Sequence, residues 1–438
     1  MNSSLRARRA IIDVAFDQPA GLLALAGEAG FAWRSPGRTL VTAGVAARIP
    51  APPGPRRLER LARVASSLLA GAGPTGAWGG VGAEGAAAAA PLVVGALPFD
   101  DLAHGELVVP ALILEQAPGG PVVAMSVAAG VDPPDPAAMA ERWVARESAQ
   151  PAQRVARESA RPAEARWPRR IEVTPCWERP GWRAAVEAIL AEIRAGRLDK
   201  AVLSRQVVLE ADRPFGRAAL LGRLAARGSG AYLYASGGFV GASPELLVAR
   251  SGGTARSRPL AGTVPRGAGA AEEARQLARL RASAKEALEH RLVLDAVAGG
   301  LAKAADLVEV AATQVVSLPT VAHLATEVTA TLGDPPPTAL DLLALLHPTP
   351  AVAGTPREVA VDLLARLEPS GRGLYAGPVG WMDANGDGEW ALALRCASLA
   401  GSNARLFAGA GIVAGSDPDA EWDETTSKLR AIFEVLST

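Results

Sequence analysis

The chain has 438 residues, with 45 Lys and Arg against 45 Asp and Glu, so its formal net charge is zero. Hydrophobic residues make up 49% and charged residues 21%, which allows a large core and excludes global disorder. The balanced charge gives no general attraction to nucleic acid or to an anionic membrane surface, so any charged function must be local. No uninterrupted apolar run approaches the ~18 residues of a membrane span.

The chain contains two cysteines, Cys176 and Cys396, far apart in the sequence. Two cysteines support neither a disulfide framework nor a zinc site of the usual kind, and buried reduced thiols are the simpler interpretation. The N-terminal residues lack the sustained apolar stretch of a signal peptide. We therefore expect a cytoplasmic protein with no nucleic-acid or membrane partner.

The predicted elements divide the chain into three parts. Residues 1–131 have the pattern of mixed short strands and helices, with strands at 92–100 and 107–109. Residues 132–170 predict a variable linker or a solvated helix, because mixed charges and alanines dominate there. An 11-residue repeat lies within this part, since the run Val-Ala-Arg-Glu-Ser-Ala starts at both Val144 and Val155.

Residues 171–438 carry the denser signals. Apolar periodicity predicts helices at 184–195, 283–302 and 421–436, and strands at 201–209, 232–235, 245–249 and 407–413. A hairpin is predicted across 377–397, with its turn at Asn-Gly-Asp-Gly from Asn385 to Gly388. Because strands and helices mix without a strict βαβ rhythm, the pattern favours an α+β fold over a doubly wound sheet.

Two acidic doublets are the strongest chemical signal. Glu286 and Glu289 are three residues apart in a predicted helix, as are Glu421 and Glu424, so each pair shares one helix face that continues into apolar residues. Like charges are expensive to bury unpaired, so two such doublets suggest a cation between them. Oxygen ligands without a Cys/His cluster favour Mg²⁺ over Zn²⁺. The alternative is a solvated first helical turn, where acids interact favourably with the helix dipole.

Three further charged residues stand in apolar surroundings. Lys200 opens a predicted strand, where it either reaches back to water or, when desolvated, serves as a base. Glu245 lies between Pro244 and an apolar run, where a raised carboxyl pKa would suit a general acid. Arg395 lies in what reads as an apolar strand, either as a carboxylate clamp or in a structural ion pair.

Seven ordered motifs resemble those of the chorismate-utilising enzymes, which include isochorismate, salicylate, anthranilate and aminodeoxychorismate synthases. The similarity runs from about residue 182 to the C-terminus, and the preceding part matches weakly, chiefly at 95–100. It implies one large catalytic fold of antiparallel sheets flanked by helices, as in anthranilate synthase component I. The motifs are KAVLSR from Lys200, FVGASPE from Phe239, PLAGTVPRG from Pro259, KEALEH from Lys285, HPTPAVAGTP from His347, YAGPVG from Tyr375 and GAGIVAGSDP from Gly409.

The resemblance implies a role for each matched residue. Glu289 and Glu424 would bind Mg²⁺ directly, with Glu286 and Glu421 acting through water. Lys200 would be the general base that activates water, and Glu245 the general acid at the leaving hydroxyl. The predicted substrate-binding residues are Gly262, Thr263, Ala351, Tyr375, Arg395, Gly409, Gly411 and Lys428.

Within this family the residues favour isochorismate synthase. Aminodeoxychorismate synthases usually carry lysine where Ala261 stands, and the lyases tend to carry threonine near Ala351. The complete Lys200 segment fits activation of water better than use of ammonia, so we expect no amidotransferase subunit. Chorismate is the expected small-molecule partner, and the protein is expected to be a monomer, with a homodimer as the alternative.

Three other functions stay open. Salicylate synthase, which forms isochorismate and then eliminates pyruvate, is the second interpretation, and anthranilate synthase component I is the third. An inactive chorismate-binding paralogue is the non-enzymatic alternative. It is disfavoured because every catalytic and metal position is filled in this sequence.

Overall fold

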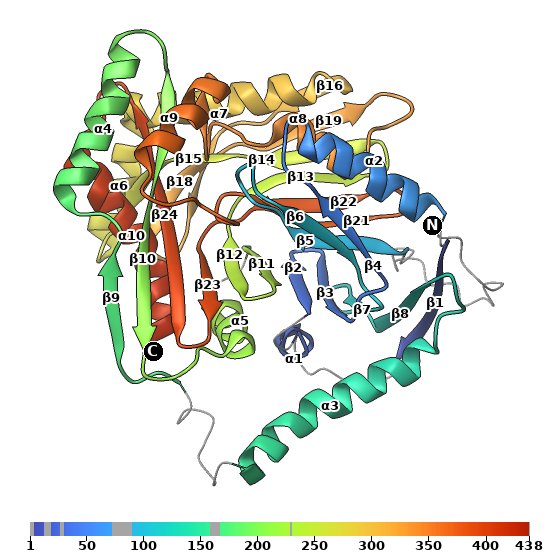
Figure 1. Ribbon diagram of the computed structural model, residues 1–438. Coiled ribbons are helices and arrows are strands. Elements are labelled where there is room, and N and C mark those ends of the chain that lie inside the picture. The colour runs from blue at the N-terminus through green and yellow to red at the C-terminus, as the bar shows by residue number, and fades with distance from the viewer. Residues whose placement is uncertain are drawn as a thin grey trace.

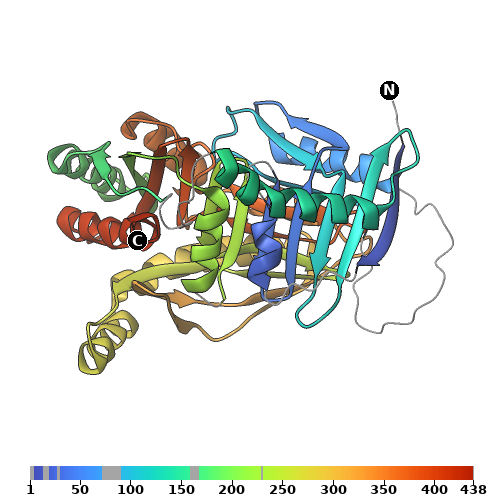
Figure 2. The ribbon, with the colours of Figure 1, turned by 90° about the horizontal axis from the view of Figure 1, so that it is seen from below.

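The structure is a computed structural model that describes residues 4–12, 19–26, 30–71, 90–157, 167–227 and 230–437. Within these ranges the chain forms two large sheets and one small sheet, with helices covering their outer faces (Figures 1 and 2). Neighbouring strands pair antiparallel in all three sheets. Helices and antiparallel strands are therefore mixed, as the sequence pattern predicts.

The first large sheet has twelve strands and contains both the N-terminal strand and the long strands of the C-terminal half. In spatial order it consists of β1 (Leu5–Ile12), β8 (Val122–Ala129), β7 (Leu112–Gln116), β3 (Arg38–Ala43), β2 (Phe31–Ser35), β11 (Tyr232–Ser236), β12 (Phe239–Ser243), β23 (Cys396–Ala400), β24 (Asn403–Val413), β10 (Lys200–Ala211) and β20 (Gly354–Thr355), with β9 (Ile171–Pro175) also paired to β10.

The second large sheet has nine strands, and the small sheet has three. The nine are β16 (Ala305–Val310), β19 (Val328–Leu332), β14 (Thr254–Arg258), β13 (Leu246–Ser251), β22 (Gly388–Leu392), β21 (Pro378–Asp383), β5 (Leu92–Ala96), β6 (Gly105–Val109) and β4 (Ala47–Ala51). The three are β15 (Leu260–Pro265), β18 (Val321–Ala325) and β17 (Gln314–Ser317).

Helices lie between and around these sheets. They are α1 (Pro19–Ala24), α2 (Arg57–Ala70), α3 (Pro136–Arg157), α4 (Arg179–Arg194), α5 (Arg217–Arg227), α6 (Ala270–Ala282), α7 (Ala284–Leu301), α8 (Ala339–Leu346), α9 (Arg357–Leu367) and α10 (Pro418–Ser437). Over the part of the chain that the structure describes, no helix is both long and apolar enough to cross a membrane.

Strands from the first and last parts of the chain share both large sheets. In one sheet β2 pairs with β11, so that Trp33 lies opposite Tyr234. In the other, β5 pairs with β21, so that Gly95 lies opposite Gly380. Residues 1–131 therefore complete the same sheets that carry the C-terminal motifs.

The main core lies where the two large sheets face each other. Trp33, Trp381 and Trp390 belong to one cluster of buried apolar side chains from both sheets. The indole Nε1 of Trp33 donates a hydrogen bond of 3.0 Å to Glu389 on the opposite sheet. Burial of these large side chains provides the main driving force that holds the sheets together.

Part of the segment between 132 and 170 is helical. Helix α3 covers Pro136–Arg157 and runs along the outside of the first sheet (Figure 2). Ala140 and Trp143 are buried among the side chains of that sheet. The second copy of the repeat begins within α3, and its remainder lies outside the described residues.

The predicted hairpin at 377–397 is shorter than expected. Strands β21 and β22 form it, and its turn contains Gly386 with a positive φ of 81°. The second strand ends at Leu392, and Cys396 starts β23 in the other large sheet. The expected continuous strand to Ala397 is therefore wrong, because the chain changes sheets between these residues.

Candidate active site

A cavity lies where the ends of β10 and β24 meet the small sheet, α7 and α10. Its free volume is small, about 50 Å³, because charged side chains extend into it. A ligand must therefore move some of these side chains aside. Nine of the predicted site residues line the cavity: Glu245, Thr263, Glu289, Ala351, Tyr375, Arg395, Gly409, Gly411 and Lys428.

Lys200 and Glu289 form a buried ion pair at one end of this cavity. Lys200 is the first residue of β10 and has no exposed surface, and its Nζ lies 3.1 Å from Oε1 of Glu289. Gly411 on the paired strand makes room for this contact. A Cβ at Gly411 would lie 2.0 Å from that same carboxylate oxygen, so no larger residue fits while the pair is in place.

Glu245 is buried at another side of the cavity, immediately before β13. Only 4% of its surface is exposed, and burial raises the pKa of its carboxyl to about 8. Its backbone N–H donates to Ser243 Oγ at 3.2 Å, which fixes the turn that carries it. At neutral pH this side chain is mostly protonated, as a general acid must be before it donates.

The two acidic doublets converge from α7 and α10. Ser283 caps α7 by accepting from the backbone N–H of Glu286, and Glu286 in turn accepts from the N–H of Thr263 at 2.8 Å. Lys285 bridges the two helices, since its Nζ lies 3.3 Å from Glu286 and 2.7 Å from Glu421. On α10, Lys428 pairs with Glu424.

Charge interactions confirm that these carboxylates lie in one electrostatic environment. Burial raises the pKa of Glu421 to about 7, and repulsion from Glu424 adds to the shift. Burial also raises the pKa of Glu286. For Glu289 burial acts in the same direction, but Lys200 and the other nearby lysines outweigh it and lower the pKa.

These carboxylates can bind a divalent cation only if the lysine side chains that pair with them move away. Among the described residues, no three His, Cys, Asp or Glu side chains already form a metal-binding group. Each of the four carboxylates instead has a lysine within 4.0 Å. Partly buried carboxylates at two facing helix ends are nevertheless suitable ligands for Mg²⁺, which prefers oxygen and needs few protein groups.

Arg395 lies in the connection between β22 and β23 and not within a strand. Its φ is 49°, a region that non-glycine residues seldom adopt, and this turn directs the guanidinium into the cavity. Its Nη2 lies 3.3 Å from Nε2 of His323. Among the described residues it forms no ion pair with a carboxylate within 4.0 Å, so the alternative interpretation, a structural ion pair, is not found there.

Small residues and one aromatic ring form the rest of the wall. Tyr375 stacks on Phe407 with ring centroids 5.1 Å apart. A Cβ at Gly409 would lie 3.0 Å from the Tyr375 hydroxyl, and the carbonyl of Gly409 accepts from Lys428 at 2.8 Å. Gly262 has a φ of 72° beside Glu286, which explains why glycine is needed there.

Comparison with known proteins identifies the family. The model of the chorismate-binding enzyme family matches residues 24–437. The chain belongs to the chorismate-binding enzyme family. Isochorismate synthase DhbC of Bacillus subtilis (strain 168) is 35% identical over 414 residues, which is 92% of this chain and 92% of that protein.

Solved structures of the family confirm the predicted fold. MenF, the menaquinone-specific isochorismate synthase from Escherichia coli, has a TM-score of 0.74 and 25% identity, covering 100% of this chain and 95% of that one. Anthranilate synthase component I from Streptococcus pneumoniae TIGR4 has a TM-score of 0.66 and 22% identity over 90% of this chain and 92% of that one, a likeness of fold.

Two polar residues of this candidate site were not predicted from the sequence. His323 lies in the buried strand β18, and its Nδ1 is 3.2 Å from the carbonyl of Gly262 and 3.1 Å from Thr263 Oγ1. Burial, with Arg395 and Lys428 nearby, holds the His323 pKa well below its usual range, so the ring is neutral. Its signal in the sequence was a lone histidine in an apolar run. The second residue is Lys285, which has no recognisable signal in the sequence, because its ion pair with α10 is a long-range contact.

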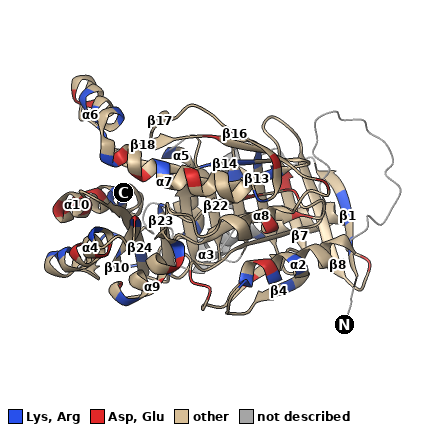
Figure 3. Cartoon of the chain, turned by 90° about the horizontal axis from the view of Figure 1, so that it is seen from above, with Lys and Arg blue, Asp and Glu red and all other residues tan. Residues whose placement is uncertain are grey.

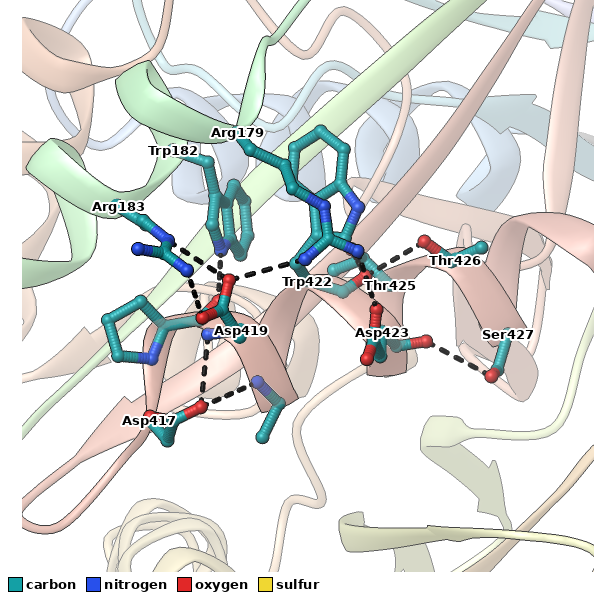
Figure 4. Close-up of polar contacts among 12 residues, drawn as sticks. Arg179, Trp182, Arg183, Asp417, Asp419, Trp422, Asp423, Thr425, Thr426 and Ser427 are labelled. Carbon is teal, nitrogen blue, oxygen red and sulfur yellow. Dashed lines mark hydrogen bonds and ion pairs between the residues drawn. The ribbon is translucent and has the colours of Figure 1, made fainter.

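The first turn of α10 is held in place by a cluster on α4 (Figure 4). Arg179 and Arg183 both pair with Asp419, and Trp182 Nε1 donates to the carbonyl of Pro418 at 3.0 Å. Trp182 also meets Trp422 edge to face, with ring centroids 6.0 Å apart. These contacts position the helical turn that carries the second acidic doublet of this chorismate-binding enzyme.

Proposed function

We propose that this protein is a Mg²⁺-dependent isochorismate synthase, an isomerase that converts chorismate into isochorismate. The observation that carries the proposal is that buried Glu245 and Arg395 line one cavity together with Glu289, which pairs with buried Lys200. Similarity to isochorismate synthase DhbC of Bacillus subtilis over 92% of both chains supports the same assignment.

The reaction exchanges a hydroxyl group between two ring carbons. Water adds at C2 while the C4 hydroxyl leaves, and the ring double bonds shift between them. Lys200, which is protonated in its ion pair with Glu289, must first lose that proton. The neutral amine then takes the proton from the attacking water, and Glu245 gives its proton to the leaving hydroxyl, so that one water is consumed and one released. The reaction needs one base and one acid at the same site, because one proton is removed and one is donated. It needs no redox cofactor.

Positive groups in the cavity fit the carboxylates of the substrate. Arg395 has a guanidinium without a carboxylate partner within 4.0 Å among the described residues, and it can bind one carboxylate through two parallel hydrogen bonds. Lys428 lies at the Gly409 carbonyl on the same wall. Tyr375 also lines this cavity.

We propose that Mg²⁺ binds between the acidic faces of α7 and α10. Glu289 and Glu424 would hold it directly, and Glu286 and Glu421 would act through water. The ion would supply positive charge that draws an anionic substrate toward four carboxylates. The raised pKa of the buried Glu421 supports this placement, because a nearby cation would relieve the cost of its ionised form.

The test is a chorismate assay with Mg²⁺ and with EDTA, followed by chromatography of the products. We expect consumption of chorismate and appearance of isochorismate with Mg²⁺ only. Failure of folded protein to consume chorismate would overturn the enzyme assignment, and full activity in EDTA would overturn the metal requirement. If the products are salicylate and pyruvate, the protein is a salicylate synthase. If anthranilate forms when ammonia is added, it is an anthranilate synthase.

We also propose that the protein acts as a monomer, without an amidotransferase subunit, in a reducing compartment such as the cytoplasm. Cys176 and Cys396 are free thiols, which supports the compartment. Its product would enter menaquinone or siderophore biosynthesis. Light scattering of the purified protein and its activity without added partners test the first two points.

A further inference from the structure

A second cavity lies beside α7, on a different face of the helix from the acidic doublet. About 620 Å³ of free volume lies in an open cavity between α7, the end of α6 and strands β17 and β18, elements that lie together at one end of the molecule (Figure 3). This volume falls within the roughly 300–1,000 Å³ of small-molecule sites. From α7 it is lined by Ala287, His290, Arg291 and Leu294, whereas Glu289 lines the first cavity and Glu286 accepts from the backbone N–H of Thr263.

The lining of this second cavity combines positive charge with an apolar wall. Arg281 and Arg291 contribute two guanidinium groups, and no acidic residue lines the cavity. Leu294, Val315 and Leu324 supply apolar surface, and Thr313, Gln314 and His290 are the other polar residues of the lining. A flat apolar body with one negative group matches this combination.

The two arginines have no acidic partner among the described residues. The neighbouring glutamates of α6 already have partners, because Glu272 pairs with Arg275 and Glu273 pairs with Arg266. No carboxylate of the described chain lies within 4.0 Å of the guanidinium of Arg281 or Arg291. The cavity therefore has unbalanced positive charge at its wall.

His290 adds a buried polar group to the same wall. Its Nε2 lies 2.7 Å from Thr326 Oγ1, but its Nδ1 has no hydrogen-bond partner among the described residues, although only 4% of the residue is exposed. An unpaired buried nitrogen lowers stability, and polar groups of this kind are often satisfied by a ligand or an ordered water.

We propose that this cavity binds a small aromatic carboxylate, with the carboxylate between Arg281 and Arg291 and the ring against Leu294, Val315 and Leu324. The site is separate from the catalytic cavity and does not depend on the proposed reaction. Because α7 carries Glu286 and Glu289 on another face, a ligand here contacts the helix that positions two of the catalytic-site acids.

Calorimetric titration with benzoate tests the site, with the neutral benzamide as the matched ligand. We expect benzoate to bind the wild type and benzamide to bind at least about tenfold more weakly, because it lacks the charge that the arginines recognise. Arg281→Gln and Arg291→Gln should each weaken benzoate binding about tenfold or more. The matched control is Arg279→Gln, an exposed arginine on the same helix as Arg281 that does not line the cavity, and it should bind as the wild type does.

Two results would overturn the proposal. One is equal benzoate affinity in all three variants and the wild type, which would place the ligand elsewhere, for example at Arg395. The other is the absence of benzoate binding at millimolar concentration. Because the titration needs no turnover, either result can be told apart from a failure of the isochorismate synthase assignment, which the chorismate assay measures separately.

Discussion

Burial of Glu245 makes a quantitative prediction about stability. Its carboxyl pKa rises from 4.5 to about 8 because the group is desolvated. At roughly 1.4 kcal/mol for each pKa unit, this difference corresponds to about 5 kcal/mol at most. The folded state holds the proton more tightly than the unfolded state. The stability contribution is therefore fully present below pH 4.5 and is lost as the pH rises toward 8.

Replacing Glu245 by Gln removes this pH dependence, because the amide has the same shape and stays neutral. Between pH 5 and pH 9, the free energy of unfolding of the wild type should fall by about 2–5 kcal/mol relative to Glu245→Gln. Urea denaturation of both proteins at the two pH values measures the difference. Glu210→Gln, at an exposed position on β10, is the control and should follow the wild type.

Turnover provides the second readout of the same substitution. Glu245→Gln should lower kcat by about 10²–10⁴-fold, the usual contribution of a general acid, with a smaller change in KM. In the wild type, kcat should fall as the pH rises through about 8, because the acid loses its proton. A pH-independent difference in unfolding free energy would refute a buried, protonated Glu245. Normal turnover of the Gln variant would refute its role as the acid.

Three further substitutions probe the metal and base positions. Lys200→Ala should abolish turnover while calorimetry still detects Mg²⁺ binding, and retained turnover would remove Lys200 as the base. Glu424→Gln should raise the Mg²⁺ concentration needed for half-maximal activity more than it lowers the urea midpoint, whereas an unchanged metal requirement would place the site elsewhere. Gly411→Ala should lower kcat/KM by about tenfold or more, because its methyl group would lie 2.0 Å from Glu289. Gly299→Ala on α7, where nothing lies within 4 Å, is its control and should keep full activity.

Local sequence pattern was sufficient for the elements that carry the acids. Apolar spacing located α7, and the observed helix covers Ala284–Leu301 within the predicted 283–302. The i, i+3 spacing also placed Glu286 and Glu289 on one buried face. Such spacing is a property of one helix, so it can be read without knowing what the helix packs against.

Long-range contacts could not be predicted in the same way. The sequence gives no sign that Lys285 reaches Glu421 across two helices, or that Lys200 meets Glu289 across from β10. The break at Arg395 was also missed, because the apolar residues on both sides read as one strand although they belong to two sheets. Pairing partners and changes of sheet depend on the whole topology, which a local pattern does not encode.

Charge balance connects the ligand-free site to the proposed reaction. With all four acids ionised, and with Lys200 protonated as it is before it acts as the base, the carboxylates of Glu286, Glu289, Glu421 and Glu424 are matched by three lysines and one arginine: Lys200, Lys285, Lys428 and Arg395. A substrate with two carboxylates entering alone would leave this site with an excess of two negative charges, and a divalent cation alone would leave two positive charges. Only the two together keep it neutral. Each should therefore raise the affinity for the other, and by thermodynamic reciprocity the factor is the same in both directions.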